Sequence, residues 1–184
     1  MGGSTSHLSD EDYEELGKQF RFSPEQITEL YQRFRRLDMT RRGSLSVQDL
    51  MKLPELAMNP MHPRILELFE KNKDERIDFA SFLTPLDIMS NGTPRERAEF
   101  AFKLYDMNND GVITTDDLEA TLDKMTGDNL TEDKREATIK HVMQVTDLDH
   151  DGIISLEDFC TAMKDSDMVQ KPVHFTFPSE LKPR

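Results

Sequence analysis

Residues 147–158 constrain this chain more than any other stretch, because they match the cation-binding loop of an EF-hand. Oxygen-bearing side chains stand at loop positions 1, 3, 5 and 9, namely Asp147, Asp149, Asp151 and Ser155. Gly152 at position 6 permits the sharp turn that such a loop requires. Ile153 at position 7 would offer its backbone carbonyl, and Asp158 at position 12 would be the last ligand.

A second copy of the same pattern lies upstream, at residues 106–117. Two copies of so constrained a pattern predict a pair of metal-binding EF-hands. The alternative is a pair of aspartate-rich turns that bind no ion. The apolar residues at position 8 of the two loops, Ile113 and Ile154, are expected to lie back to back and to couple the loops.

The first half of the chain carries two weaker copies of the loop. Residues 38–49 keep Gly43 at position 6, but Arg42 occupies position 5, where a carboxylate is needed and where a guanidinium repels a divalent cation. Residues 70–81 lack the glycine and end on Ser81 in place of an acidic ligand. Both loops are therefore expected to bind no metal.

Apolar residues at helical spacing flank all four loops, which predicts an all-α protein of four helix-loop-helix units in two pairs. An N-terminal helix and a C-terminal extension add to this two-lobed EF-hand fold. The expected divisions are an N-terminal segment (1–22), an N-lobe (23–92), a C-lobe (93–170) and a C-terminal tail (171–184). Pro85 is expected to interrupt the last helix of the N-lobe.

Both complete loops end on aspartate, Asp117 and Asp158, where a calcium sensor usually has glutamate. Aspartate is one methylene shorter, so from the same backbone it supplies one oxygen more easily than two. The lower coordination number favours Mg²⁺ over Ca²⁺, and we expect weakened Ca²⁺ binding with Mg²⁺ as a competing ion.

Composition excludes several classes of function. The net charge of −13 and pI of about 4.8 argue against nucleic-acid binding. The single cysteine, Cys160, rules out an internal disulfide framework and suits a reducing compartment. No apolar run is long enough to span a membrane, no signal peptide is visible, and no convergent set of catalytic residues is present, so an enzyme is not expected.

The two ends of the chain carry further signals. The start matches the N-myristoylation pattern, with Gly2 as the acylated residue, and the alternative is an unmodified terminus. One acyl chain gives only marginal membrane binding, so a partner or second signal would be needed. Near the other end, Val173, Phe175 and Phe177 alternate with polar residues, and this segment either covers an apolar groove of the protein or is a loose tail.

Several short sequences, distributed over nearly the whole chain, resemble one family of EF-hand proteins. They are Met1-Gly2-Gly3-Ser4, Leu53-Pro54-Glu55-Leu56, Asn59-Pro60, Arg64-Ile65, Ala101-Phe102, Tyr105-Asp106 and Met125-Thr126-Gly127. Together with the aromatic tail, they resemble the calmyrins, also called calcium- and integrin-binding proteins. The resemblance implies Ca²⁺ or Mg²⁺ only in the third and fourth hands, on Asp106, Asn108, Asp110, Val112, Asp117, Asp147, Asp149, Asp151, Ile153 and Asp158.

By the same resemblance the protein is a regulatory adaptor. It would hold a cytoplasmic helix of a membrane protein, such as an integrin α tail or a TMC-type mechanotransduction channel, at the inner face of the plasma membrane, as a monomer within a hetero-complex. The groove would draw on apolar positions that are first of all core: Phe79, Phe82, Leu83, Leu86, Phe102, Leu118, Leu122, Met125, Val142, Met143, Phe159 and Met163.

Two other hypotheses stay open. The Pro-Glu-Leu and Asn-Pro sequences are shared with calcineurin-B homologous proteins, so the chain could be a calcineurin-B-like regulatory subunit of an ion exchanger or a phosphatase. It could also be a soluble ion buffer with no partner.

Overall fold

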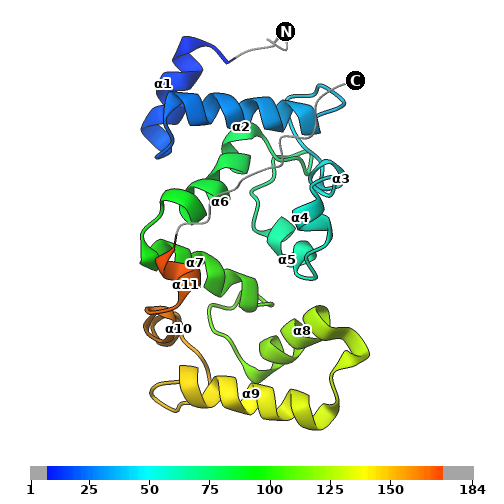
Figure 1. The fold of residues 1–184 in the computed structure, drawn as a ribbon, viewed down its shortest axis with the longest axis vertical. Coiled ribbons are helices and arrows are strands. Elements are labelled where there is room, and N and C mark those ends of the chain that lie inside the picture. Colours follow the sequence, from blue (N-terminus) through cyan, green and yellow to red (C-terminus); the bar gives the residue numbers. More distant parts are fainter. Residues whose placement is uncertain (1–7, 172–184) are drawn as a thin grey trace.

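The structure is a computed structural model that describes residues 8–171 of the 184-residue chain. The proposed acylation site Gly2 and the apolar tail residues Val173, Phe175 and Phe177 lie outside the described residues. Within those residues the chain is helical, with no named strand, and its helices form an upper and a lower lobe in Figure 1. The predicted all-α EF-hand fold is confirmed.

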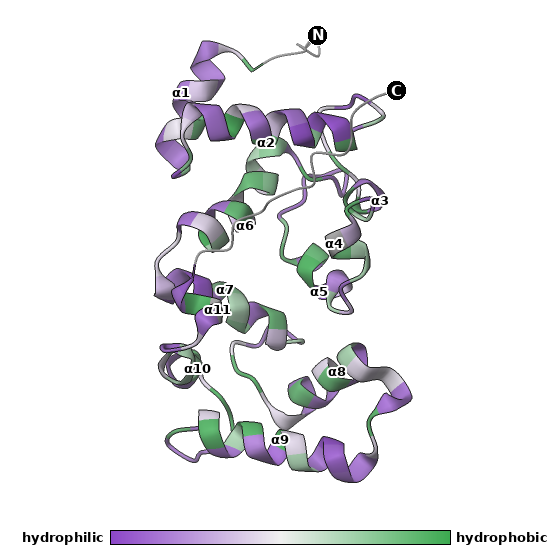
Figure 2. Ribbon diagram, viewed as in Figure 1, coloured by the Kyte–Doolittle hydropathy of each residue, from purple (hydrophilic) through white to green (hydrophobic). Residues whose placement is uncertain are grey.

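Six helices build the N-lobe: α1 (Asp10–Gln19), α2 (Pro24–Leu37), α3 (Val47–Leu50), α4 (Pro54–Ala57), α5 (His62–Glu67) and α6 (Phe79–Asn91). Helix α2 begins at a capping box, in which Ser23 accepts a hydrogen bond from the Gln26 amide while the Gln26 side chain accepts one from the Ser23 amide. Figure 2 shows α6 as mostly hydrophobic and α1 as mostly hydrophilic, and α6 is the helix that supplies much of the N-lobe core.

The C-lobe contains α7 (Pro94–Tyr105), α8 (Thr115–Thr126), the short 3-10 helix η1 (Gly127–Asn129), α9 (Glu132–Thr146), α10 (Leu156–Met163) and α11 (Asp167–Gln170). A capping box of Thr93 and Glu96 opens α7. Thr131 stands at the N-cap of α9, but its side chain makes no capping hydrogen bond.

Each lobe has its own hydrophobic core, and an isolated antiparallel bridge joins the two loops within each lobe. Leu45 pairs with Ile77 in the N-lobe, and Ile113 pairs with Ile154 in the C-lobe through two hydrogen bonds of 2.9 and 2.8 Å. All four residues are almost fully buried. The expected back-to-back placement of Ile113 and Ile154 is confirmed, and these residues join the two C-lobe loops directly.

The sequence predicts that Pro85 interrupts the helix after the second loop, and this prediction is wrong. Helix α6 runs unbroken from Phe79 to Asn91 with the buried Pro85 inside it. Leu83 and Leu86, on either side of the proline, are buried in the core, and this packing holds the helix together where propensity alone would end it.

The link between the lobes is short. Helix α6 ends at Asn91 and α7 starts at Pro94, and a Cβ at the intervening Gly92 would collide with the carbonyl of Ile88. Arg21 adds a tie across the same junction, since its guanidinium pairs with Asp87 of α6 at 2.9 Å and with Glu96 of α7 at 2.8 Å. The two lobes therefore meet at a packed junction with several direct contacts.

Candidate metal centre

The loops after α7 and α9 are organised by a buried aspartate at position 1. Asp147 closes α9 and accepts hydrogen bonds from the amides of His150 (2.8 Å) and Gly152 (3.0 Å). Asp106 closes α7 and accepts from the amides of Asp110 (3.2 Å) and Gly111 (3.1 Å). Each loop thus wraps around one carboxylate, which fixes where the other oxygens lie.

Two residues of each loop adopt left-handed backbone conformations, at positions 4 and 6. In the last loop these are His150 (φ 62°) and Gly152 (φ 91°), and in the preceding loop Asn109 (φ 57°) and Gly111 (φ 90°). Glycine at position 6 avoids the steric cost of this conformation, and asparagine is among the side chains that tolerate it best at position 4. The tight curl brings the oxygen-bearing side chains to one side.

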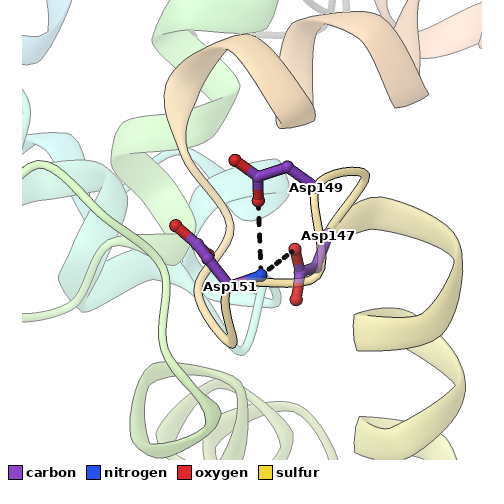
Figure 3. Close-up of side chains that lie close together, drawn as sticks. All are labelled: Asp147, Asp149 and Asp151. Carbon is purple, nitrogen blue, oxygen red and sulfur yellow. Dashed lines mark hydrogen bonds between the residues drawn. The ribbon is translucent and has the colours of Figure 1, made fainter.

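Three carboxylates meet in the last loop. Asp147, Asp149 and Asp151 each offer an oxygen, and these atoms lie within 4.8 Å of one another (Figure 3). Hard divalent cations prefer such oxygen ligands, so these residues fit the ion that the sequence predicts. In the preceding loop Asn108 replaces one carboxylate and donates its amide to Asp110 at 2.8 Å, so that loop carries less negative charge.

The aspartates at position 12 have a second role, because each closes a capping box at the start of the exit helix. Oδ2 of Asp117 accepts from the amide (2.8 Å) and hydroxyl (2.6 Å) of Thr114. Oδ2 of Asp158 accepts likewise from Ser155, at 3.0 and 2.5 Å. One oxygen of each carboxylate thus bonds the cap, and the other accepts from a loop amide, Met107 for Asp117 (3.0 Å) and Leu148 for Asp158 (3.3 Å).

These hydrogen bonds also keep both carboxylates ionised. Burial raises the pKa of Asp117, but the hydrogen bonds from Thr114 and from the loop amides lower it more, so its pKa lies below the ordinary value. For Asp158 the hydroxyl of Ser155 is the main cause of a lowered pKa. A charged carboxylate is the form that binds a cation, so neither residue needs to lose a proton near neutral pH.

The first N-lobe loop keeps the same backbone frame without the same chemistry. Asp38 accepts from the amide of Gly43 at 2.7 Å, as its C-lobe counterparts do from their own glycines. Yet Lys52 lies 2.7 Å from Asp49 at position 12, and Arg76 hydrogen-bonds the carbonyl of Ser44 at position 7. Side-chain cations of the protein therefore contact two of the positions at which an EF-hand ion would be held.

An apolar cavity of about 300 Å³ lies beside the C-lobe loops, between α8, α9 and α10. Of the apolar positions named from the sequence, six line it: Leu118, Leu122, Met125, Val142, Phe159 and Met163. Met125 is half exposed at 52%, so the cavity reaches the surface. Thr121 also lines it, and its buried hydroxyl has no hydrogen-bond partner among the described residues.

The remaining candidate groove residues lie elsewhere. Phe102 and Met143 belong to the C-lobe core cluster without lining the cavity. The four N-lobe candidates do not share this cavity either, because they are buried in the N-lobe core: Phe79, Phe82, Leu83 and Leu86. Their apolar stripe packs inward against α2, where Phe34 contacts Phe79 and Phe82.

Three features were not found from the sequence: the two side-chain cations, Lys52 and Arg76, that contact the first loop from outside it, the unsatisfied Thr121 hydroxyl, and a buried arginine, Arg64, that reaches the third loop from the N-lobe. Arg64 appeared only as part of a family resemblance. Its partners in the C-lobe are 39 to 45 residues further along the chain, and no local pattern connects them.

Fold and loops together define an EF-hand protein with a divalent-cation module in its C-lobe. Residues 95–164 match the family model described as an EF-hand domain pair. The chain is 36% identical to the type 2 calcineurin B subunit of Dictyostelium discoideum, with 90% of this chain and 91% of the relative covered. It is 35% identical to the type 2 calcineurin B subunit of Homo sapiens, with 83% and 90% covered. The chain belongs to the calcineurin B family of EF-hand proteins.

This membership supports the calcineurin-B-like hypothesis better than the calmyrin resemblance, which these relatives do not specifically show. The calcineurin B subunit of Naegleria gruberi is also similar, at 34% identity over 93% of this chain and 97% of the relative. None of the helices within residues 8–171 is long and apolar enough to cross a membrane.

Proposed function

We propose that this protein is a Ca²⁺-binding regulatory subunit of the calcineurin B type, which holds an amphipathic helix of a partner protein in the C-lobe cavity. The observation that carries the proposal is the cavity itself, which is apolar, opens at Met125 and contains the unsatisfied hydroxyl of Thr121. Apolar side chains of a helix at i, i+3 and i+4 fit such a groove.

Thr121 adds a requirement on the partner. A buried hydroxyl without a hydrogen bond costs about 1–3 kcal/mol, so a partner that supplies one polar group at this point relieves that cost. The two methionines, Met125 and Met163, are flexible and let the groove adapt to different apolar side chains. The partner helix is therefore expected to be apolar on one face with one central polar residue.

Peptides test the proposal and separate its variants. Isothermal titration would measure the binding of helical peptides of about 25 residues from a calcineurin catalytic subunit, an integrin α tail and a TMC-type channel, each with Ca²⁺ and with Mg²⁺. We expect the calcineurin peptide to bind most tightly, since the relatives are calcineurin B subunits. Tighter binding of an integrin or channel peptide would instead support the membrane-protein adaptor that the calmyrin resemblance implies.

Variants locate the binding site. Met125→Gln and Leu122→Asp should each weaken the peptide at least about ten-fold, equivalent to about 1.4 kcal/mol. Met58→Gln is the matched control, because Met58 is 84% exposed in the N-lobe, outside the cavity. Undiminished binding to both cavity variants would place the partner elsewhere, and a protein that binds none of the peptides but still binds ions would be a buffer.

The N-terminus gives a separate proposal about location. We infer from the myristoylation pattern that Gly2 is acylated and that the protein is cytoplasmic and associates peripherally with the plasma membrane, together with its partner. Mass spectrometry of the protein expressed with an N-myristoyltransferase would detect the acyl group, and Gly2→Ala should abolish it. An unmodified wild-type N-terminus would refute this proposal without touching the helix-binding one.

A further inference from the structure

Arg64 belongs to α5 of the N-lobe but is bound to the C-lobe. Its side chain is almost fully buried, and its Nε and Nη2 atoms lie 3.0 and 2.6 Å from the carbonyl oxygen of Lys103. Nη2 also lies 2.5 Å from the carbonyl of Asp106 and 2.6 Å from Oδ1 of Asn109. All three acceptors lie where α7 ends and the first complete metal loop begins, and Figure 1 shows α5 beside this point.

The position suits a cation for two reasons. The last carbonyls of a helix lack intrahelical partners, and the C-terminal end of a helix carries partial negative charge. Arg64 satisfies the carbonyl of Lys103 in the last turn of α7 and lies beside a loop that contains several carboxylates. Its one carboxylate partner among the described residues is Glu67, at 2.8 Å, and Glu67 is itself 59% exposed. The oxygens at the end of α7 and in the loop together therefore account for most of what holds the buried guanidinium.

The contacts fall on the residues that shape the loop. Asp106 is loop position 1, around which the loop wraps, and Asn109 is position 4, with a left-handed backbone. The equivalent residue of the last loop, His150, is exposed, and its imidazole makes no hydrogen bond to any residue from 8 to 171. Within the part of the chain that the structure describes, position 4 of the fourth hand therefore has no N-lobe side chain that corresponds to Arg64.

We propose that Arg64 is a positioning residue of the first complete metal loop, so that this site is built by both lobes and an ion bound there also stabilises the N-lobe. The inference rests on the proposed ion binding. Because the bonds from Arg64 to Asp106 and Asn109 need the loop in the form that the structure has, an ion that stabilises this form raises the cost of releasing α5. By thermodynamic linkage, a formed N-lobe favours ion binding to the same extent.

Amide hydrogen exchange of the full chain measures this coupling, since each lobe carries its own reporter. The amides of Leu45 and Ile77 form the N-lobe bridge, and those of Ile113 and Ile154 form the C-lobe bridge. In the wild-type protein, saturating Ca²⁺ should slow exchange at both bridges, by about ten-fold at the N-lobe bridge.

Two variants remove the contact from opposite sides. Arg64→Met deletes the guanidinium, and Asn109→Gly deletes one acceptor while keeping a residue that tolerates the left-handed backbone. In each variant, Ca²⁺ should still slow exchange at the C-lobe bridge. At the N-lobe bridge, Ca²⁺ should slow exchange less than about two-fold in Arg64→Met, and by an intermediate factor in Asn109→Gly. Should Arg64→Met fail to fold, Asn109→Gly alone decides the matter.

Two controls match these variants. His150→Gly changes the same loop position in the fourth hand, and Arg21→Met breaks an inter-lobe tie that does not touch a metal loop. Both should keep the wild-type response of the N-lobe bridge. If Ca²⁺ slows exchange at the N-lobe bridge as much in Arg64→Met or Asn109→Gly as in the wild type, this inference alone is overturned. If Ca²⁺ does not slow exchange at the C-lobe bridge of the wild-type protein, the proposed ion binding is overturned, and this inference with it.

Discussion

Replacing Asp49 by asparagine should destabilise the N-lobe by about 2 kcal/mol at neutral pH. Asp49 is position 12 of the first loop, where Lys52 at 2.7 Å and Arg76 at 3.8 Å stand in for a metal ion. Burial raises the pKa of Asp49, but hydrogen bonds from Lys52 and from Ser46 outweigh it and lower the pKa to about 2. The ionised form of Asp49 is therefore more stable in the folded N-lobe than in the unfolded chain.

The magnitude follows from the two pKa values. A fall from the ordinary value of 3.8 to about 2 corresponds to about 2 kcal/mol, at 1.36 kcal/mol per unit. Since the folded pKa is the lower one, this stability is fully present well above pH 4 and is lost as the pH falls toward 2. At pH 3 roughly half of it, about 1 kcal/mol, should remain.

Urea unfolding, followed by NMR on the backbone amides of Leu45 and Ile77, would measure the free energy of unfolding of the N-lobe at pH 7 and at pH 3. The difference between wild type and Asp49→Asn should shrink between the two pH values. Asp74→Asn, an exposed change in the second loop, is the control and should stay within about 0.5 kcal/mol. A deficit for Asp49→Asn that is the same at both pH values would refute the electrostatic argument.

Three further changes test other parts of the structure. Gly92→Ala forces a Cβ against the carbonyl of Ile88 and should lower the unfolding free energy by about 1–3 kcal/mol in thermal melts; an unchanged melting temperature would count against a packed junction. Ile154→Ala empties a buried site that joins the two C-lobe loops, and calorimetry should show a loss of about 2–4 kcal/mol in stability with weaker ion binding at both loops, not one. Changing Asp117 and Asp158 together to glutamate supplies longer ligands and should raise the ratio of Ca²⁺ affinity to Mg²⁺ affinity, measured by calorimetry. The same ratio in the wild type and in the variant would contradict the coordination argument.

Local spacing was enough to predict most of the fold and the loops. The twelve-residue pattern places oxygens, glycine and the apolar position 8 by sequence alone, and capping boxes such as Ser23 with Gln26 depend on residues three apart. Local spacing could not find the hydrogen bonds of Arg64 to Lys103 and of Arg76 to Ser44, because these partners lie 39 and 32 residues away along the chain. It also could not tell an inward stripe from a groove, since Phe79 in the N-lobe core and Leu122 at the cavity follow the same helical period.

The loops of the two lobes share one backbone geometry but differ in where their positive charge comes from: side chains in the N-lobe and, on the proposed function, a bound ion in the C-lobe. This difference bears on regulation. At the first loop the positive charges beside Asp49 are the side chains of Lys52 and Arg76, which are always present. The loop around Asp49 is therefore held in place at any ion concentration. In the C-lobe loops the predicted ligand carboxylates gather without such a cation among the described residues. Arg64 contacts neutral oxygens of the third loop, and Arg95 pairs with Glu157, which is not a predicted ligand. On the proposed function, an ion therefore acts on the C-lobe, next to the partner cavity. Among the hydrogen bonds of the described residues, those of Arg64 join the N-lobe directly to a C-lobe loop, so on the proposed coupling Arg64 is the route by which a bound ion affects the N-lobe.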